Sequence, residues 1–97
     1  MIVRASNGSG GGGNVVISWG VDNCYNSPKT YPCNNAMFFV GNVFGPESAM
    51  AAGYVNDGVL TKTKEESGLA SITYTSGNLV LSESYSSVYG KVYIMYQ

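Results

Sequence analysis

The sequence predicts an all-β domain, an antiparallel β-sandwich of about seven or eight short strands with jelly-roll-like or Greek-key connections. Short runs of apolar and β-branched residues recur at close intervals along the chain, which is typical of a sandwich or a barrel. Asp57-Gly58 and Ser76-Gly77 each separate two such runs, as the central dipeptides of tight hairpins do. The 97 residues are enough for one domain.

The expected strands extend from the N-terminal region to the last residues of the chain. Residues 2–4 form a short strand ahead of the glycine-rich segment 7–13, so residues 1–13 precede a sandwich domain of residues 14–97. The strands expected in that domain are residues 15–19, 36–43, 50–56, 59–64, 69–75, 78–83 and 90–96. Residues 46–52 begin with proline, which is tolerated at the first helical position, and are expected to form one helical turn.

Alternation along these strands indicates which side chains form the core. In residues 69–75, for example, Ala70, Ile72 and Tyr74 share one face, because successive side chains of a strand point to opposite faces. The same reasoning over the whole chain predicts that the following apolar residues point inward: Trp19, Phe38, Val40, Ile72, Leu79, Leu81, Val92 and Ile94.

The last strand carries apolar residues on both of its faces. If Val92 and Ile94 point into the core, Tyr93 and Met95 point away from it, although a sandwich needs only one buried face per strand. Charge is also scarce, at 11% of residues, and residues 67–82 carry none. Because a domain of this size has a small core of its own, we expect a homo-oligomer with Tyr93 and Met95 in the interface.

Charge and hydropathy exclude two classes of partner. The net charge is −1 and the five basic residues are scattered, so we expect no binding to nucleic acid. The apolar stretch of residues 36–40 is far too short to cross a bilayer, and we expect no membrane insertion. Residues 1–6 lack the apolar centre of a secretory signal, which predicts synthesis in the cytoplasm without a signal peptide.

The residues needed for most catalytic sites are missing. The chain has no histidine, which excludes a Ser-His-Asp triad and a Cys-His dyad within one chain, and its six acidic residues show no paired catalytic pattern. Cys24 and Cys33 alone cannot complete a zinc site. We therefore expect a protein that is not an enzyme and that holds no metal and no cofactor. The two cysteines form either a short-loop disulfide or two free thiols, and the sequence leaves both alternatives open.

Two segments have the composition of binding loops. Residues 22–35 are the longest irregular stretch and are enriched in Tyr, Ser and Asn; residues 82–89 overlap the end of a predicted strand and contain four serines and two tyrosines. Adaptable binding loops combine rigid aromatic area with hydrogen-bonding groups in this way. Tyr25 and Tyr31 in the first segment, and Tyr85 and Tyr89 in the second, are therefore candidates for stacking on a sugar ring. The alternative is that both segments are ordinary surface loops.

The run SITYTSGNLVLSESYSSVYGKVYIMY, residues 71–96, follows a glycine-rich opening and ends in an aromatic strand. Together these features resemble small β-structured bacteriophage virion proteins of the tail-fibre tip, head-fibre and capsid-decoration types. The resemblance implies a symmetric oligomer, with a trimer favoured, and a place in the virion beside other virion proteins. It assigns no functional residue.

The leading hypothesis is a non-enzymatic virion structural protein that acts in assembly or in attachment to a host surface, where a glycan would be the partner. The alternative is a carbohydrate-binding, lectin-like module. A symmetric oligomer favours the first hypothesis, and a monomer that binds glycans favours the second.

Overall fold

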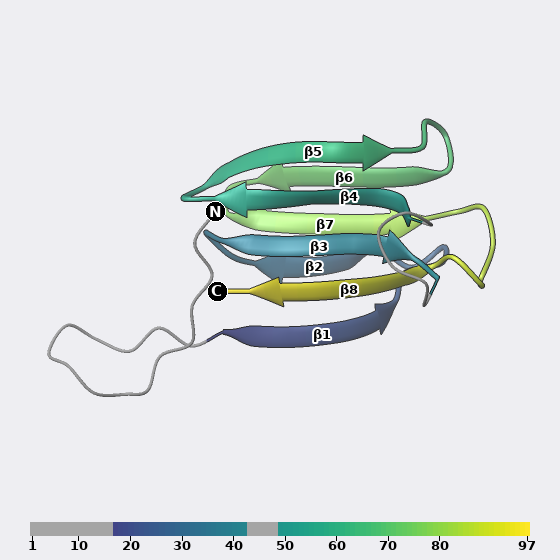
Figure 1. Cartoon of the computed structure of the whole chain (residues 1–97), viewed down its shortest axis with the longest axis horizontal. Coiled ribbons are helices and arrows are strands. Elements are labelled where there is room, and N and C mark those ends of the chain that lie inside the picture. The colour runs from purple at the N-terminus through teal and green to yellow at the C-terminus, as the bar shows by residue number, and fades with distance from the viewer. Residues whose placement is uncertain (1–16, 43–48) are drawn as a thin grey trace, which may run out of the picture.

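The computed structural model describes residues 17–42 and 49–97, and these residues form an antiparallel β-sandwich (Figure 1). One sheet has five strands in the order β1-β8-β3-β4-β5, and the other has three in the order β2-β7-β6. The strands are β1 (Ser18–Asn23), β2 (Lys29–Pro32), β3 (Ala36–Gly41), β4 (Ala49–Asn56), β5 (Val59–Glu65), β6 (Ala70–Thr75), β7 (Asn78–Glu83) and β8 (Lys91–Tyr96). The predicted fold class is confirmed.

The two predicted hairpins join β4 to β5 and β6 to β7. Asp57 and Gly58 have φ values of 48° and 80°, and Ser76 and Gly77 have values of 53° and 79°. Positive φ at both central residues is the geometry of a type I′ turn, whose twist matches that of the flanking strands. The two dipeptides therefore fix the registers of both pairs, with Asn56 opposite Val59 and Thr75 opposite Asn78.

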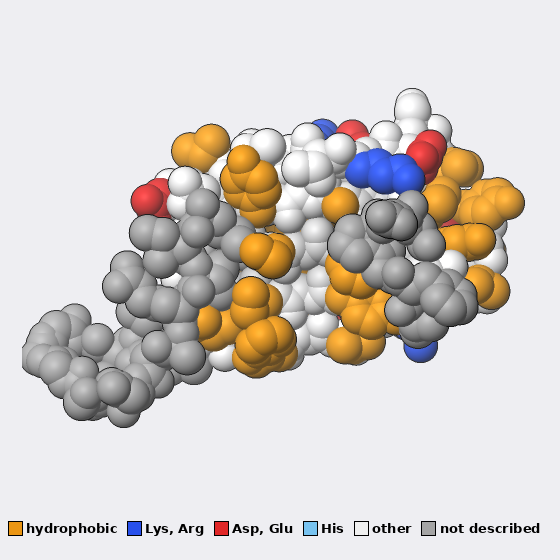
Figure 2. Space-filling view, viewed as in Figure 1, with side chains coloured by type: hydrophobic (Ala, Val, Ile, Leu, Met, Phe, Trp, Pro, Cys, Tyr) orange, Lys and Arg blue, Asp and Glu red, His pale blue; other side chains and the backbone are white. Residues whose placement is uncertain are grey.

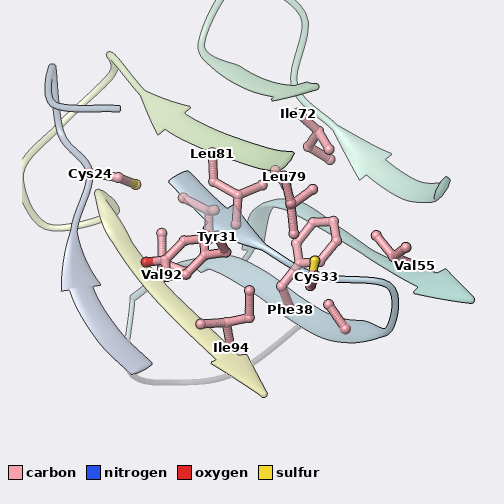
Figure 3. Packing of buried hydrophobic residues seen from close by; sticks show 13 residues of the cluster. Cys24, Tyr31, Cys33, Phe38, Val55, Ile72, Leu79, Leu81, Val92 and Ile94 are labelled. Carbon is pink, nitrogen blue, oxygen red and sulfur yellow. The ribbon is translucent and has the colours of Figure 1, made fainter. Parts of the chain in front are cut away.

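The core lies between the two sheets, and seven of the eight predicted core residues are in it. Figure 3 shows residues from both sheets that point toward one another. The residues confirmed as buried are Phe38, Val40, Ile72, Leu79, Leu81, Val92 and Ile94. The eighth prediction is wrong, because Trp19 is 76% exposed.

Trp19 points outward because another ring fills the space beneath β1. Trp19 pairs with Met95 and shares its face, so the core side of β1 carries Gly20 and Asp22 instead. A Cβ atom added to Gly20 would lie 3.8 Å from Cε1 of Tyr31, which belongs to the opposite sheet. The Tyr31 ring thus takes the place that the sequence analysis gave to Trp19.

Two local predictions are corrected, and others lie outside the described residues. Residues 22–35 are not one irregular loop, since they contain the end of β1 and the whole of β2. No helical turn forms over residues 49–52, because these residues belong to β4, where Ala49 and Ala51 are fully or almost fully buried. The expected strand at residues 2–4 and the glycine-rich segment 7–13 lie outside the described residues, as do residues 46–48 of the expected helical turn.

Both cysteines are buried free thiols. Cys24 and Cys33 belong to the core cluster and lie in separate parts of it in Figure 3, so the disulfide alternative is not what the structure contains. Burial, together with the nearby Glu83 carboxylate, raises the pKa of Cys24 from 9.0 to about 11. Burial also raises the pKa of Cys33. Thiols held in the protonated form are poor nucleophiles.

Candidate functional site

The outer face of the five-stranded sheet is built from apolar side chains in two rows that cross the strands. The pairing register places Trp19 of β1 beside Met95, Met95 beside Met37, and Met37 beside Tyr54. One step along the strands, the register aligns Val21, Tyr93, Phe39 and Ala52 in the same way. We call these side chains the apolar face: Trp19, Val21, Met37, Phe39, Ala52, Tyr54, Tyr93 and Met95.

The apolar face lines a hollow of about 630 Å³ that is open on one side. All eight of its side chains line the hollow. Thr63 and the residues that lie between the eight within β1, β3, β4 and β8 complete the lining. The Phe39 and Tyr93 rings stack with centroids 4.7 Å apart and planes 19° apart. Trp19, Val21 and Met37 are exposed to 76%, 65% and 51%, so the hollow is open to water along the β1 side and over β3.

Charge lies at the border of the apolar face and not within it. Lys62 and Lys64 of β5 form ion pairs with Glu65 and Glu66, at 3.2 Å and 3.6 Å. Lys91, opposite Asn23 in the register, marks the other border along β8. In Figure 2, several charged side chains lie toward the upper edge, where Figure 1 places β5, and hydrophobic side chains are spread over the part of the face below that is not drawn in grey.

The outer face of the three-stranded sheet has the opposite character. Apart from Pro32 and Val80, its side chains are small and polar: Thr30, Ser71, Thr73, Thr75, Asn78 and Ser82. These residues are exposed or half-buried, as expected for a sheet face in water. The same sandwich therefore has one outer face suited to water and one that is not.

The structure places Tyr93 and Met95 where the sequence predicted, on the side of β8 away from the core. That this side is an interface remains a prediction. The other members of the face were not predicted from the sequence. Met37 and Phe39 had a detectable signal, because they alternate with the buried Phe38 and Val40 in a run that is apolar at every position from 36 to 40.

The prediction that Tyr31 stacks on a sugar is wrong, because only 5% of this residue is exposed. Its hydroxyl donates a hydrogen bond to Oδ2 of Asp22 at 2.5 Å, and its ring meets the edge of Tyr96 at a centroid distance of 5.3 Å. Burial, reinforced by the Asp22 carboxylate, raises the pKa of Tyr31 well above its ordinary value. Tyr31 therefore packs the core and has no free ring face for a ligand.

The other predicted tyrosines lie near the end of β7. Tyr85 is 57% exposed and its ring centroid lies 5.8 Å from that of Tyr89 in the connection between β7 and β8. Tyr25 is half-buried and forms an isolated β-bridge with Glu83, the last residue of β7. Tyr85 is thus exposed and Tyr89 half-buried beside it, and their role in stacking on a sugar stays a prediction.

Glu83 organises this end of the molecule. Its carboxylate is buried, and Oε1 accepts hydrogen bonds from the backbone N–H groups of Tyr85 (2.8 Å) and Ser86 (2.6 Å). Oε2 is buried without a hydrogen-bond partner among the described residues. Its role in the fold is to hold the start of the β7–β8 connection, since the two N–H groups would otherwise need water.

A second hollow, of about 410 Å³, is polar and lies beside β6 and β7. Four of its eight lining residues are serines, and none is aromatic. Its one carboxylate, Glu65, already accepts from the Ile72 N–H at 2.7 Å and from Lys62. The hollow therefore lacks both the stacking ring and the free acceptor that a sugar site uses.

Three further findings bear on function. In residues 17–42 and 49–97, no three His, Cys, Asp or Glu side chains gather as a metal site would require. No helix in the same residues is long and apolar enough to cross a membrane. Comparison of the chain with protein-family models, with curated proteins and with solved structures finds no match in any of the three.

Proposed function

We propose that this chain is a non-enzymatic structural protein of a virion that works as a homo-oligomer, and that the apolar face joins its copies. The observation that supports this most is the difference between the two outer faces of one sandwich. The hydroxyl-bearing outer face of the three-stranded sheet is suited to contact with water. The other outer face exposes Trp19, Val21 and Met37, and such an exposed apolar patch is typical of a surface that binds a partner.

A second copy is the partner whose chemistry fits. Burying one large apolar side chain contributes about 1.5–3 kcal/mol, and several of the eight members of the face are large. Together they can exceed an association cost of about 4–15 kcal/mol. No charged side chain belongs to the face, so copies meeting there bring no like charges together. Closed symmetry then removes the patch from water on every copy, and the resemblance to viral fibres favours a trimer.

The test is the mass in solution of the wild type and of matched lysine variants. We expect light scattering at micromolar concentration to give three copies or a multiple of three. Met37→Lys and Tyr93→Lys place a charge within the face and should lower the mass without loss of β structure by circular dichroism. Thr73→Lys places the same charge on the exposed outer face of the three-stranded sheet and should leave the mass unchanged.

A wild type that stays monomeric, or a mass lowered equally by Thr73→Lys, contradicts the assembly function. The place in a virion is tested separately, by antibody labelling of purified particles from cells that produce the chain. We expect labelling at a regular position on the particle, beside the other virion proteins that it contacts.

A carbohydrate-binding, lectin-like module is the second candidate, and the Tyr85–Tyr89 pair, in which Tyr85 is exposed, supports it. The same pair would serve a virion protein in attachment to a host-surface glycan. Binding on a glycan array that Tyr85→Ala abolishes and Tyr54→Ala leaves intact would assign the pair to sugar binding. Such binding by a protein that is monomeric in solution would favour the stand-alone module.

A further inference from the structure

The two sheets have four edge strands, and three of them are protected against pairing with another chain. The edge strand β5 carries Lys62 and Lys64, and lysines on an edge disfavour strand addition. The edge strand β2 has only four residues and contains Lys29 and Pro32. A short strand with a charge and a proline is a poor template for a partner.

The edge strand β6 is closed by the end of β5 and the connection that follows it. The Ile72 N–H donates to the Glu65 carboxylate at 2.7 Å, and the Ala70 N–H donates to the Glu66 carbonyl at 2.9 Å. The Ile72 N–H, followed by the Lys62 ammonium, holds the pKa of Glu65 below its ordinary value. Two of the backbone donors that would bind an added strand are thus already occupied.

The edge strand β1 has none of these protections on its free side. The Cys24 N–H bonds to the Gly90 carbonyl at 2.7 Å, on the side of β8. Because backbone groups alternate in direction along a strand, those of Asp22 and Gly20 face β8 as well, and those of Trp19, Val21 and Asn23 face away. In the described part of the chain, no strand lies on that outer side of β1.

The one charge on β1 points inward, as charges that protect an edge can, but it already has a hydrogen-bond partner in the core. The Asp22 side chain is on the core side of the strand, where its carboxylate accepts from the Tyr31 hydroxyl. In a two-fold antiparallel pairing centred on Val21, Asp22 comes opposite Gly20 of the second copy, which has no side chain. The two Asp22 carboxylates are therefore not directly opposite each other.

We propose that β1 pairs edge to edge with β1 of a second copy, antiparallel and about a two-fold axis at Val21. Val21 then faces Val21 of the second copy, and Trp19 faces its Asn23, each pair exchanging both N–H···O bonds. The axis is perpendicular to the joined sheet, so the two apolar faces lie on the same side. The row of Val21, Tyr93 and Phe39 continues across the join, and the edge contact doubles whatever assembly the face builds.

This inference rests on the self-association proposed above, and amide exchange separates the two. Residue-resolved hydrogen exchange by NMR is measured on the full chain at concentrations where light scattering finds the assembly and where it finds the monomer. We expect the amides of Trp19, Val21 and Asn23 to exchange at least about tenfold more slowly in the assembly. The amides of Gly20 and Asp22 are the internal control, because they bond to β8 at every concentration.

Fast exchange of Trp19, Val21 and Asn23 in the assembled protein overturns the edge pairing and leaves the face contact standing. Equal protection of these amides in the monomer also overturns it, because the edge is then covered within one copy. A protein that is monomeric at every concentration overturns the assembly function, and the edge pairing with it.

The variant test is Val21→Pro. Proline removes the one N–H at the centre of the proposed join and none of the β1–β8 bonds, so the mass in solution should fall to half. Val21→Ala shortens the same side chain but keeps the N–H, and should keep the mass. An unchanged mass for a folded Val21→Pro protein overturns the proposal. If Val21→Pro does not fold, the exchange measurement on the wild type decides.

Discussion

The Tyr31 hydroxyl lies 2.5 Å from Oδ2 of Asp22, to which it donates a hydrogen bond that joins the two sheets. Tyr31 belongs to β2 of the three-stranded sheet and Asp22 to β1 of the five-stranded sheet. The Tyr74 hydroxyl of β6 donates a bond of 2.6 Å to the Cys33 carbonyl, which directly follows β2, so this second bond lies within the three-stranded layer. The Tyr31–Asp22 bond thus ties together the two layers of a sandwich whose core is small.

Tyr31→Phe should lower the free energy of unfolding by about 1.5–3 kcal/mol, the usual contribution of a hydrogen bond to a charged group. Phenylalanine keeps the ring in the core and leaves the Asp22 carboxylate without its donor. Urea denaturation followed by circular dichroism measures the change. Tyr85→Phe is the control, because that tyrosine is exposed, and it should change stability by less than about 0.5 kcal/mol. Equal losses in the two variants would contradict the role of the bond.

Stability should fall at alkaline pH, beginning near pH 9. The pKa of Cys24 is 9.0 in the unfolded chain and about 11 in the fold, so the unfolded state loses its proton first. The contribution of the Cys24 thiol to the free energy of unfolding is therefore fully present below pH 9. It decreases as the pH rises, by about 2 kcal/mol at pH 11. Tyr31 extends the loss above pH 10, since its pKa is also raised.

Denaturation midpoints of the wild type and of Cys24→Ala, measured between pH 7 and pH 11, check this dependence. The variant should be less stable at pH 7, because a core side chain is truncated. It should also lose less stability between pH 9 and pH 10. A parallel decrease in both proteins would show that Cys24 does not titrate as its burial implies.

Glu83→Gln and Glu83→Ala should differ clearly in stability. Glutamine keeps an acceptor for the N–H groups of Tyr85 and Ser86 and removes a buried charge, so we expect a change within about 1 kcal/mol. Alanine leaves both donors without their partner and should cost about 2 kcal/mol or more. Chemical denaturation measures both values, and faster amide exchange at Tyr85 and Ser86 should accompany the alanine change alone. Equal effects of the two substitutions would contradict the bonding role of Oε1.

Gly53→Ala should destabilise the protein by about 3 kcal/mol, at the upper end of what overpacking usually costs. A methyl group there would overlap the carbonyl oxygen of Thr61, where the β4–β5 register shifts, and would press on the Phe38 ring. Gly58→Ala is the comparison. It meets no atom within 4 Å and only strains a backbone with φ of 80°, which costs about 1 kcal/mol. Thermal or urea unfolding of the two variants should rank them in this order, and the reverse order would contradict the close approach at Gly53.

The parts of the fold that were predictable from sequence are those set by local chemistry. Asp57-Gly58 and Ser76-Gly77 adopt positive φ cheaply, and the alternation of Leu79 and Leu81 with polar neighbours identifies the buried side of β7. The two hairpins then place most of the core. Neither inference requires knowledge of which sheet a strand joins.

The remaining features depend on contacts between distant segments. Trp19 and Tyr31 are both large and aromatic, and only the packing of β1 over β2 decides which of them fills the core. Strand β2 was not predicted, because Lys29 and Pro32 are not typical strand residues and an edge strand needs no alternation of apolar residues on its outer side. Ala49 and Ala51 favour a helix by intrinsic propensity, but pairing with β3 and burial decide for a strand. The apolar face was only partly predictable, since it joins residues from four strands in a register that the sequence does not state.

Because one outer face is apolar and the other is polar, this sandwich is amphipathic and should be surface-active. At a boundary between water and air or oil, the side bearing Trp19 and Met37 should turn to the non-aqueous phase and the side bearing Thr73 and Thr75 to water. Adsorbed molecules would then share one orientation, with their strands parallel to the boundary. Lowered surface tension and a polarised amide I signal from the adsorbed layer are the measurable signs of that orientation.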